Sequence, residues 1–210
     1  MIYFRSDYSL GAHPKVMQAL IDTNMEHTDG YAEDKYSFET ADMIREMIGK
    51  PDAHVHFMVG GTPTNTVTIA AALRPFEGVI SADSGHIYVH ETGSVEATGH
   101  RVFAAPTEDG KLRPADIEKV LLHHEDEHTV IPKMVYITHP TENGGVYTKA
   151  ELKALHDCCR EHDLYLYADG ARLGTALTWP GNDVTLKDMA DLTDAFYIGG
   201  TKLGALFGEA

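Results

Sequence analysis

Cysteine is scarce in this chain of 210 residues: Cys158 and Cys159 are its two cysteines, and they are adjacent. They fall within a helical pattern, in which neighbouring side chains point about 100° apart. This geometry excludes an intrachain disulfide between them, and a reducing compartment fits the cysteine usage best. We therefore expect a soluble, cytoplasmic protein.

Positive charge and long apolar runs are also lacking. The chain has 17 Lys and Arg against 32 Asp and Glu, which gives a net charge of −15 with histidine neutral. Binding to nucleic acid or to an anionic membrane needs clustered Lys and Arg, so neither partner is expected. The sequence has no apolar stretch of about 18 residues that would predict a membrane span, and it begins without the pattern of a signal peptide.

What the sequence does contain is a recurrence of short apolar runs followed by helical patterns. The runs cover residues 54–59, 78–82, 101–105, 133–138, 164–168 and 195–198, and the helical patterns cover residues 13–24, 35–49, 65–73, 114–124 and 149–162. Such alternation is typical of a parallel sheet buried on both faces. We predict a three-layer α/β domain with a mostly parallel central sheet. The two helices before residue 50 are expected to pack outside this sheet.

Residues directly after each apolar run are the ones to search for chemistry, because parallel sheets bind ligands beyond the carboxyl ends of their strands. These positions are Gly60-Gly61-Thr62, residues 83–86, residues 139–143, residues 169–172 and Thr201-Lys202.

The first two candidates are an anion cradle and a buried acid. Gly60, Gly61 and Thr62 precede a predicted helix, whose free N-terminal amides could bind a phosphate; the alternative is a tight turn with Thr62 as the N-cap. Asp169 ends an apolar run, where an ionised carboxylate needs a partner. That partner is either a protonated heterocyclic nitrogen, as a pyridinium requires, or Arg172 in a pair that caps the next helix.

The remaining candidates are an amine and an imidazole. A lysine among small residues at a strand end, as Lys202 is, can serve as a Schiff-base amine; the alternative is a surface lysine in a glycine loop. His86 could stack on a flat ring or move a proton, or be structural like most of the 13 histidines. His123, His124 and His128 resemble a solvated helix end without zinc-ligand spacing, so we expect no metal site.

Together these candidates indicate one cofactor. An anion cradle, an acid for a ring nitrogen, a flat stacking group and a Schiff-base amine are the parts of a pyridoxal 5'-phosphate site. The sequence therefore predicts that the chain binds this cofactor.

The same positions resemble the L-threonine aldolase and β-eliminating lyase group of fold-type-I pyridoxal-phosphate enzymes. The resemblance runs essentially end to end, through residues 4–7, 13–16, 30–34, 60–62, 85–86, 91–93, 169–173 and 200–202. Its most specific part is the segment Asp-Gly-Ala-Arg-Leu at residues 169–173 with Lys202 downstream.

The resemblance also implies roles for these residues. Lys202, with Thr201 beside it, would hold the cofactor as a Schiff base, Asp169 would pair with the pyridine nitrogen, and His86 would stack on the ring. Gly60, Gly61 and Thr62 would hold the phosphate, while Arg172 and Ser6 would face the substrate carboxylate or a cofactor oxygen. His86, or a water, would remove the β-hydroxyl proton when the Cα–Cβ bond breaks.

Two departures from the family pattern bear on substrate and domain organisation. Typical threonine aldolases read Glu-Asn-Thr-His where residues 139–143 of this chain read His-Pro-Thr-Glu-Asn. Glu142 thus replaces an imidazole near the substrate. The resemblance further implies a small C-terminal domain that residues 1–210 do not contain, so the chain would comprise an N-terminal arm (about residues 1–12) and the cofactor-binding large domain.

The expected function is cleavage of the Cα–Cβ bond of β-hydroxy-α-amino acids into glycine and an aldehyde. The alternatives are a related β-eliminating lyase, an aminotransferase-like enzyme, or a non-catalytic fragment that keeps the fold. Sites of this fold usually borrow residues from a partner chain, which implies a homodimer or homotetramer.

Overall fold

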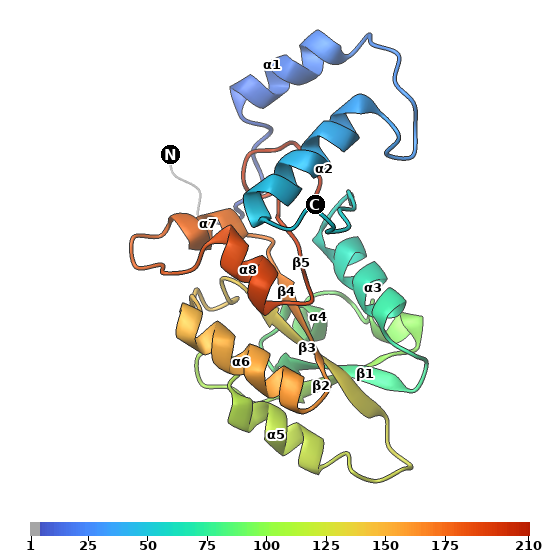
Figure 1. Cartoon of the computed structure of the whole chain (residues 1–210), viewed down its shortest axis with the longest axis vertical. Coiled ribbons are helices and arrows are strands. Elements are labelled where there is room, and N and C mark those ends of the chain that lie inside the picture. Colours follow the sequence, from blue (N-terminus) through green and yellow to red (C-terminus); the bar gives the residue numbers. More distant parts are fainter. Residues whose placement is uncertain (1–4) are drawn as a thin grey trace.

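A five-stranded, all-parallel sheet organises the computed structural model, which describes residues 5–210 (Figure 1). The strands are β1 (Glu77–Ala82), β2 (Arg101–Ala105), β3 (Ile131–Thr138), β4 (Tyr165–Asp169) and β5 (Ala195–Phe196), in the spatial order β2-β1-β3-β4-β5. Each neighbouring pair is parallel. The α/β architecture predicted from the alternating runs is confirmed.

Helices cover both faces of the sheet. They are α1 (Pro14–Thr23), α2 (Lys35–Ile48), α3 (Gly61–Ala72), α4 (His86–Val89), α5 (Pro114–Leu122), α6 (Lys149–Glu161), α7 (Leu173–Thr178) and α8 (Leu186–Leu192), with a short 3₁₀ turn at Glu96–Thr98. One apolar cluster packs α5, α6, α7 and α8 against one face, and the other cluster packs α3 and α4 against the opposite face (Figure 1). The fold therefore has three layers.

Alternation along the strands explains the continuous apolar runs. Ile80 and Leu166 point into the first cluster, whereas their neighbours Val79 and Tyr167 point into the second, and all four side chains are buried. A strand covered by helices on both faces needs apolar side chains at odd and even positions alike.

The predicted run at residues 54–59 is not a strand, and that prediction is wrong. Only Met58 pairs, through an isolated antiparallel bridge in which it exchanges two backbone hydrogen bonds of 2.8 Å with Glu209. The segment meets the chain at Glu209, whose neighbour Ala210 pairs with Ile198 just after β5, and none of residues 54–59 is buried. With so short a partner and no covering layer, its apolar residues do not form a ladder.

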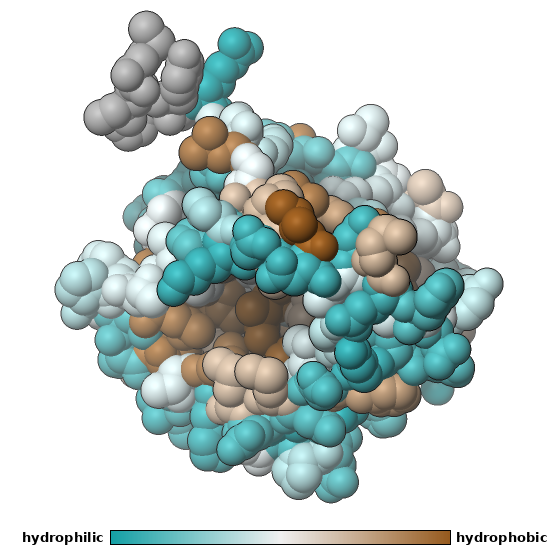
Figure 2. Space-filling view, turned by 90° about the horizontal axis from the view of Figure 1, so that it is seen from above, coloured by the Kyte–Doolittle hydropathy of each residue, from teal (hydrophilic) through white to brown (hydrophobic). Residues whose placement is uncertain are grey.

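The two helices that precede the sheet extend away from it, as expected (Figure 1). α1 buries none of its residues. α2 buries only Ala41 and Ile48. Lys50, just after the end of α2, forms an ion pair with Asp191 of α8 at 2.6 Å. Figure 2 views the molecule from the end where α1 lies, and shows apolar patches among hydrophilic side chains around a central hollow.

No helix within residues 5–210 has the length and apolar character needed to cross a lipid bilayer.

Candidate active site

Two glycines bring the loops after β4 and β5 into backbone contact. Gly199 N–H donates to the carbonyl of Gly170 at 2.9 Å. A Cβ atom on Gly170 would lie 1.8 Å from the carbonyl oxygen of Tyr197, and one on Gly199 would lie 2.3 Å from that of Ala171. Neither position has room for a side chain. The close approach places the loop of Lys202 beside the loop that begins at Asp169.

Asp169 is buried at the carboxyl end of β4 and accepts four hydrogen bonds. Its Oδ2 accepts from the Asn65 amide at 2.9 Å and from the Tyr136 hydroxyl at 2.6 Å. Its Oδ1 accepts from the Tyr197 hydroxyl at 2.6 Å and from the Ala171 backbone amide at 3.0 Å. These four donors satisfy the buried carboxyl group of Asp169 and fix its orientation at this edge of the sheet.

Asn65 extends this network from Asp169 to His86. The Asn65 amide nitrogen also donates to Glu91 Oε1 at 2.8 Å, and the same oxygen lies 2.7 Å from His86 Nδ1. A carboxylate can only accept, so His86 carries its proton on Nδ1 and presents Nε2 as the free nitrogen. The hydrogen bond that His86 donates to Glu91 is the largest cause of the raised pKa of His86.

Glu142 meets His86 from the loop after β3. Its Oε1 accepts from the His86 backbone amide at 2.9 Å and from the Thr138 hydroxyl at 2.8 Å. Burial raises the pKa of this carboxyl. The replacement noted in the sequence, a carboxyl where the family pattern has an imidazole, therefore lies next to His86.

The Gly60-Gly61 turn opens α3 at the same edge. Gly60 is the N-cap and makes no side-chain capping bond, whereas Thr62 lies inside the helix. The alternative in which Thr62 is the N-cap is therefore wrong. Gly61 faces the Tyr197 hydroxyl, which would lie 2.9 Å from a Cβ at that position, so the N-terminus of α3 adjoins the hydroxyl that binds Asp169.

Lys202 follows a loop held by Glu209. Glu209 accepts from the Gly200 backbone amide at 2.8 Å and from the Thr201 hydroxyl at 2.9 Å, and burial raises the pKa of its carboxyl. The Lys202 ammonium lies 5.6 Å from the centre of the Tyr8 ring. Within residues 5–210 it forms no ion pair.

Arg172 pairs with the N-terminal segment and not with Asp169. Its guanidinium binds both carboxylate oxygens of Asp7, which lowers the pKa of Asp7 and raises that of Arg172. The alternative of an Asp169–Arg172 pair is thus wrong. Ser6, next to Asp7, accepts a weak hydrogen bond from the Tyr8 amide at 3.4 Å.

The residues present fit pyridoxal 5'-phosphate on two observations. Asp169 is a buried carboxyl group held by four hydrogen bonds at the end of β4, where a carboxyl group can pair with a pyridinium. The first turn of α3 has amides without a side-chain cap, as a phosphate site requires.

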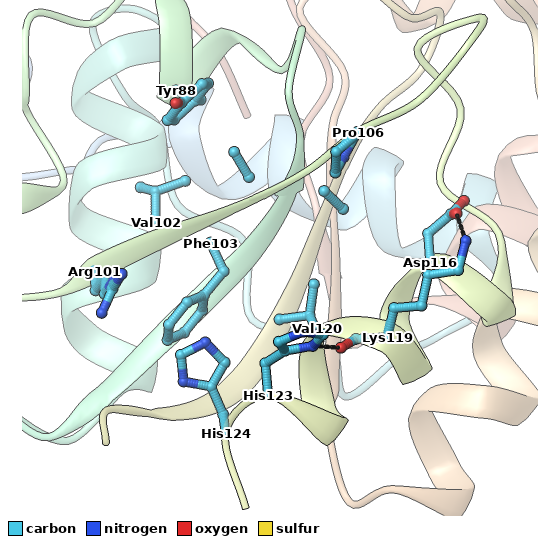
Figure 3. Close-up of a pocket in the computed structure, with 12 residues that line it drawn as sticks. Tyr88, Arg101, Val102, Phe103, Pro106, Asp116, Lys119, Val120, His123 and His124 are labelled. Atoms are coloured by element: carbon cyan, nitrogen blue, oxygen red, sulfur yellow. Dashed lines mark hydrogen bonds and ion pairs between the residues drawn. The ribbon is translucent and has the colours of Figure 1, made fainter. Parts of the chain in front are cut away.

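A well-defined cavity lies elsewhere. It has a volume of about 650 Å³ and follows the edge strand β2, between Tyr88 and the side chains of α5 (Figure 3). None of the candidate site residues lines it.

Several residues of the network were not predicted from the sequence. Asn65, Tyr136 and Tyr197 sit inside apolar or helical patterns, where nothing in the spacing distinguishes them from core residues. Glu91 lay within a family motif without an assigned role. Its buried position beside a histidine is visible only in the fold.

Comparison with known proteins places this constellation in a family. The family model described as beta-eliminating lyase matches residues 3–206. A curated low specificity L-threonine aldolase of Pseudomonas aeruginosa is 34% identical over 99% of this chain, which covers 60% of that protein. The chain thus spans about 60% of the length of this relative and of a second curated low specificity L-threonine aldolase, from a Pseudomonas species.

Solved structures agree. The structure of a threonine aldolase of Leishmania major is 53% identical, with a TM-score of 0.96 over 97% of this chain and 60% of that one. An aminotransferase of Escherichia coli, at 14% identity and a TM-score of 0.74, shares the fold alone. With a family model that spans nearly all its residues, this chain belongs to the beta-eliminating lyase family.

Proposed function

We propose that this chain forms the cofactor-binding part of a pyridoxal-phosphate-dependent lyase that cleaves the Cα–Cβ bond of β-hydroxy-α-amino acids, giving glycine and an aldehyde. The observation that carries the proposal is the continuous network from Asp169 through Asn65 and Glu91 to His86, beside the loop of Lys202. The names of the relatives support the same reaction class.

The residues that would hold the cofactor divide by the part they bind. Asp169 would face the ring nitrogen, and the amides of Gly60, Gly61 and Thr62 would bind the phosphate. Lys202, next to Thr201, would attach to the aldehyde. When bound, the cofactor supplies an electron-withdrawing ring that weakens a bond at Cα of the amino acid.

His86 is the proposed base. Its Nδ1 is engaged by Glu91, so its Nε2 is free to accept a proton from the β-hydroxyl of the substrate. The raised pKa of His86 makes Nε2 a stronger proton acceptor. His86 would at the same time lie against the cofactor ring, because its side chain is only partly exposed beside Asn65 and Glu91.

Substrate recognition is proposed for Glu142, Arg172 and Ser6. Arg172 offers a bidentate group suited to a carboxylate, and the substrate carboxylate would compete with Asp7 for it. Glu142, which contacts the His86 amide, would lie near the β-substituent.

The test is turnover by the purified chain supplied with pyridoxal 5'-phosphate. L-threonine and L-allo-threonine are added in turn, and glycine and acetaldehyde are measured. Release of both products in equal amounts supports the proposal. Visible absorbance of bound cofactor without either product contradicts the lyase assignment and favours the non-catalytic alternative, while accumulation of a pyridoxamine form favours the aminotransferase-like one.

The role of Lys202 is tested with the variant Lys202→Ala, and Lys187→Ala is its matched control. Lys187 lies on the exposed side of α8, where it pairs with Asp191 at 3.4 Å. We expect Lys202→Ala to abolish borohydride-stable attachment of the cofactor and Lys187→Ala to leave it unchanged. Retained attachment and turnover in Lys202→Ala would reject the assignment of Lys202.

We further propose that the chain assembles as a homodimer or homotetramer in the cytoplasm. The support for assembly is α1, which buries no residue and exposes Val16, Met17, Leu20 and Ile21. The support for a reducing compartment is that both cysteines are free.

A further inference from the structure

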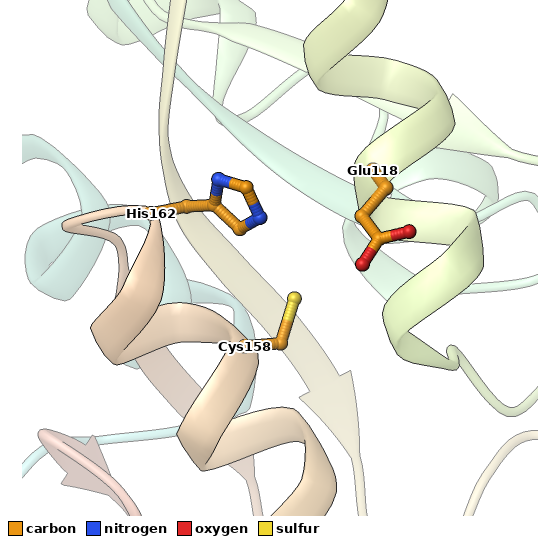
Figure 4. Close-up of side chains that lie close together, drawn as sticks. All are labelled: Glu118, Cys158 and His162. Atoms are coloured by element: carbon orange, nitrogen blue, oxygen red, sulfur yellow. The ribbon is translucent and has the colours of Figure 1, made fainter.

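A thiol, an imidazole and a carboxylate converge on the outer surface of the helical layer formed by α5 and α6. Among residues 5–210, Glu118, Cys158 and His162 form the one group of His, Cys, Asp and Glu side chains whose ligand atoms all lie within 4.8 Å of one another. Figure 4 shows the three groups turned toward a common space between the two helices. We propose that this cluster is a zinc site that joins α5 to α6.

The backbone arrangement favours chelation. Cys158 and His162 are four residues apart, one turn of helix, so their side chains leave the same face of α6 at its C-terminal end. Glu118 comes from the middle of α5. Because Cys158 and His162 are fixed on one turn of α6, only Glu118 has to be positioned by tertiary packing. The apolar contacts between α5 and α6 hold Glu118 near the other two ligands.

The donor set selects the metal. Sulfur, imidazole nitrogen and carboxylate oxygen are the ligands of Zn²⁺, and three of them leave a fourth tetrahedral position for water. Magnesium and calcium require oxygen ligands, so a thiol excludes them. On binding, a bond between zinc and the Cys158 sulfur replaces the S–H bond, and the proton passes to the buffer.

The local field also favours a cation. His162 is the C-cap of α6, where the helix dipole places partial negative charge. The chain as a whole carries a net charge of −15. Arg160 does not oppose the ion directly, because its guanidinium pairs with Asp194 at 2.5 Å.

The cluster is separate from the candidate active site. α6 begins after the carboxyl end of β3 and runs back to the start of β4, so its C-terminal end lies at the amino edge of the sheet. Asp169 lies at the carboxyl end of β4. The proposal therefore does not depend on the proposed lyase function.

The experiment titrates Zn²⁺, and Co²⁺ as a spectroscopic probe, into the purified full chain. We expect one equivalent of Zn²⁺ to bind and to raise the melting temperature. Co²⁺ should give a sulfur-to-metal charge-transfer band. His162→Ala and Glu118→Gln, both at exposed positions, should each weaken binding by more than about tenfold, the smallest effect typical of losing even an outer-shell partner.

Cysteine variants distinguish this site from adventitious binding by other histidines. Cys158→Ser should abolish the charge-transfer band, whereas Cys159→Ser, at the adjacent buried thiol outside the cluster, should keep it. Two outcomes would overturn the proposal: no saturable binding by the wild-type chain, or binding that His162→Ala and Glu118→Gln leave unchanged. Because both of these variants alter surface residues, a folding defect would not obscure the result.

Discussion

One hydrogen bond with Glu91 orients the His86 imidazole and raises its pKa. The 2.7 Å separation between Glu91 Oε1 and His86 Nδ1 fixes the tautomer, and this hydrogen bond is the main cause of the raised pKa of the imidazole. Asn65 binds the same carboxylate oxygen, so the side chain of Glu91 is held from two sides. At the scale of single residues, His86, the proposed base, and Asp169 belong to one hydrogen-bonded unit.

Glu91→Gln should lower the pKa of His86. The base must be neutral to accept a proton, so activity is lost as the pH falls through the raised pKa. Removing the negative charge moves this acidic limb of kcat/KM to lower pH. The measurement is the pH profile of kcat/KM together with an NMR titration of the His86 ring; an unchanged ring pKa would show that Glu91 does not set it.

The same contact makes a pH-dependent contribution to stability. The pKa of His86 is higher in the folded chain than its ordinary value of 6.5. The hydrogen bond between His86 and Glu91 therefore stabilises the fold fully at pH values below the pKa of His86 in the unfolded chain. This stabilisation is lost as the pH rises through the pKa of His86 in the folded chain. Glu91→Gln should flatten this part of the stability profile.

Tyr136→Phe should destabilise the fold by about 1–3 kcal/mol, the typical cost of leaving a buried acceptor short of a donor. The Tyr136 hydroxyl is one of four donors to Asp169 and is fully buried. Urea unfolding measures the loss. Tyr8→Phe is the control, because Tyr8 is exposed and its substitution should change the free energy of unfolding by no more than about 0.5 kcal/mol.

Helix α6 begins with a complete capping box, as α8 does. Thr148 accepts from the Glu151 amide at 3.2 Å, and the Glu151 carboxylate accepts from the Thr148 amide at 2.7 Å. This capping box satisfies two amides that the helix leaves free. It begins the helix at the residue where the sequence pattern predicts it, Lys149.

Thr148→Ala should cost about 1 kcal/mol of stability, the usual effect of removing an N-cap oxygen. Thr148→Ser keeps the oxygen and serves as the matched variant, with a much smaller effect. Both are measured by denaturant unfolding. Equal losses in the two variants would mean that the threonine methyl group, and not the cap, is responsible.

Across residues 5–210, two apolar clusters share one sheet, and α1 adds an apolar surface that packs into neither cluster. α1 turns its apolar residues outward, although its pattern is amphipathic. An amphipathic helix normally buries its apolar face. A second copy of the chain is the partner proposed above.

Leu20→Glu should weaken that assembly. Leu20 is 45% exposed, so a charge there costs the isolated chain little, but it would be buried unpaired in an interface. Light scattering should show the mass falling toward the 23.1 kDa of one chain. Gln18→Glu, on the same helix, adds the same charge where Gln18 is bonded to Asp22 at the surface, and it should leave the mass unchanged.

The sequence by itself determined the α/β class, four of the five helices predicted with small differences at their ends, and the positions of Asp169 at the end of β4 and of His86 and Lys202 in the segments after β1 and β5. These are local signals: apolar spacing, helix caps and glycine turns act over a few residues. Gly60, in contrast, follows a segment that is not a strand. The fifth predicted helix, at 65–73, also formed, but it begins earlier, at Gly61.

Only the tertiary structure decided which side chains meet. Asn65 reaches Glu91 across 26 residues and Asp169 across 104, and Arg172 pairs with Asp7 instead of Asp169. The failed strand at residues 54–59 has the same cause, since an apolar run forms a ladder only where a neighbouring strand is available. Hydrogen-bond partners and strand neighbours are set by contacts between residues that are far apart in the sequence. The local periodicity of apolar residues does not predict these contacts.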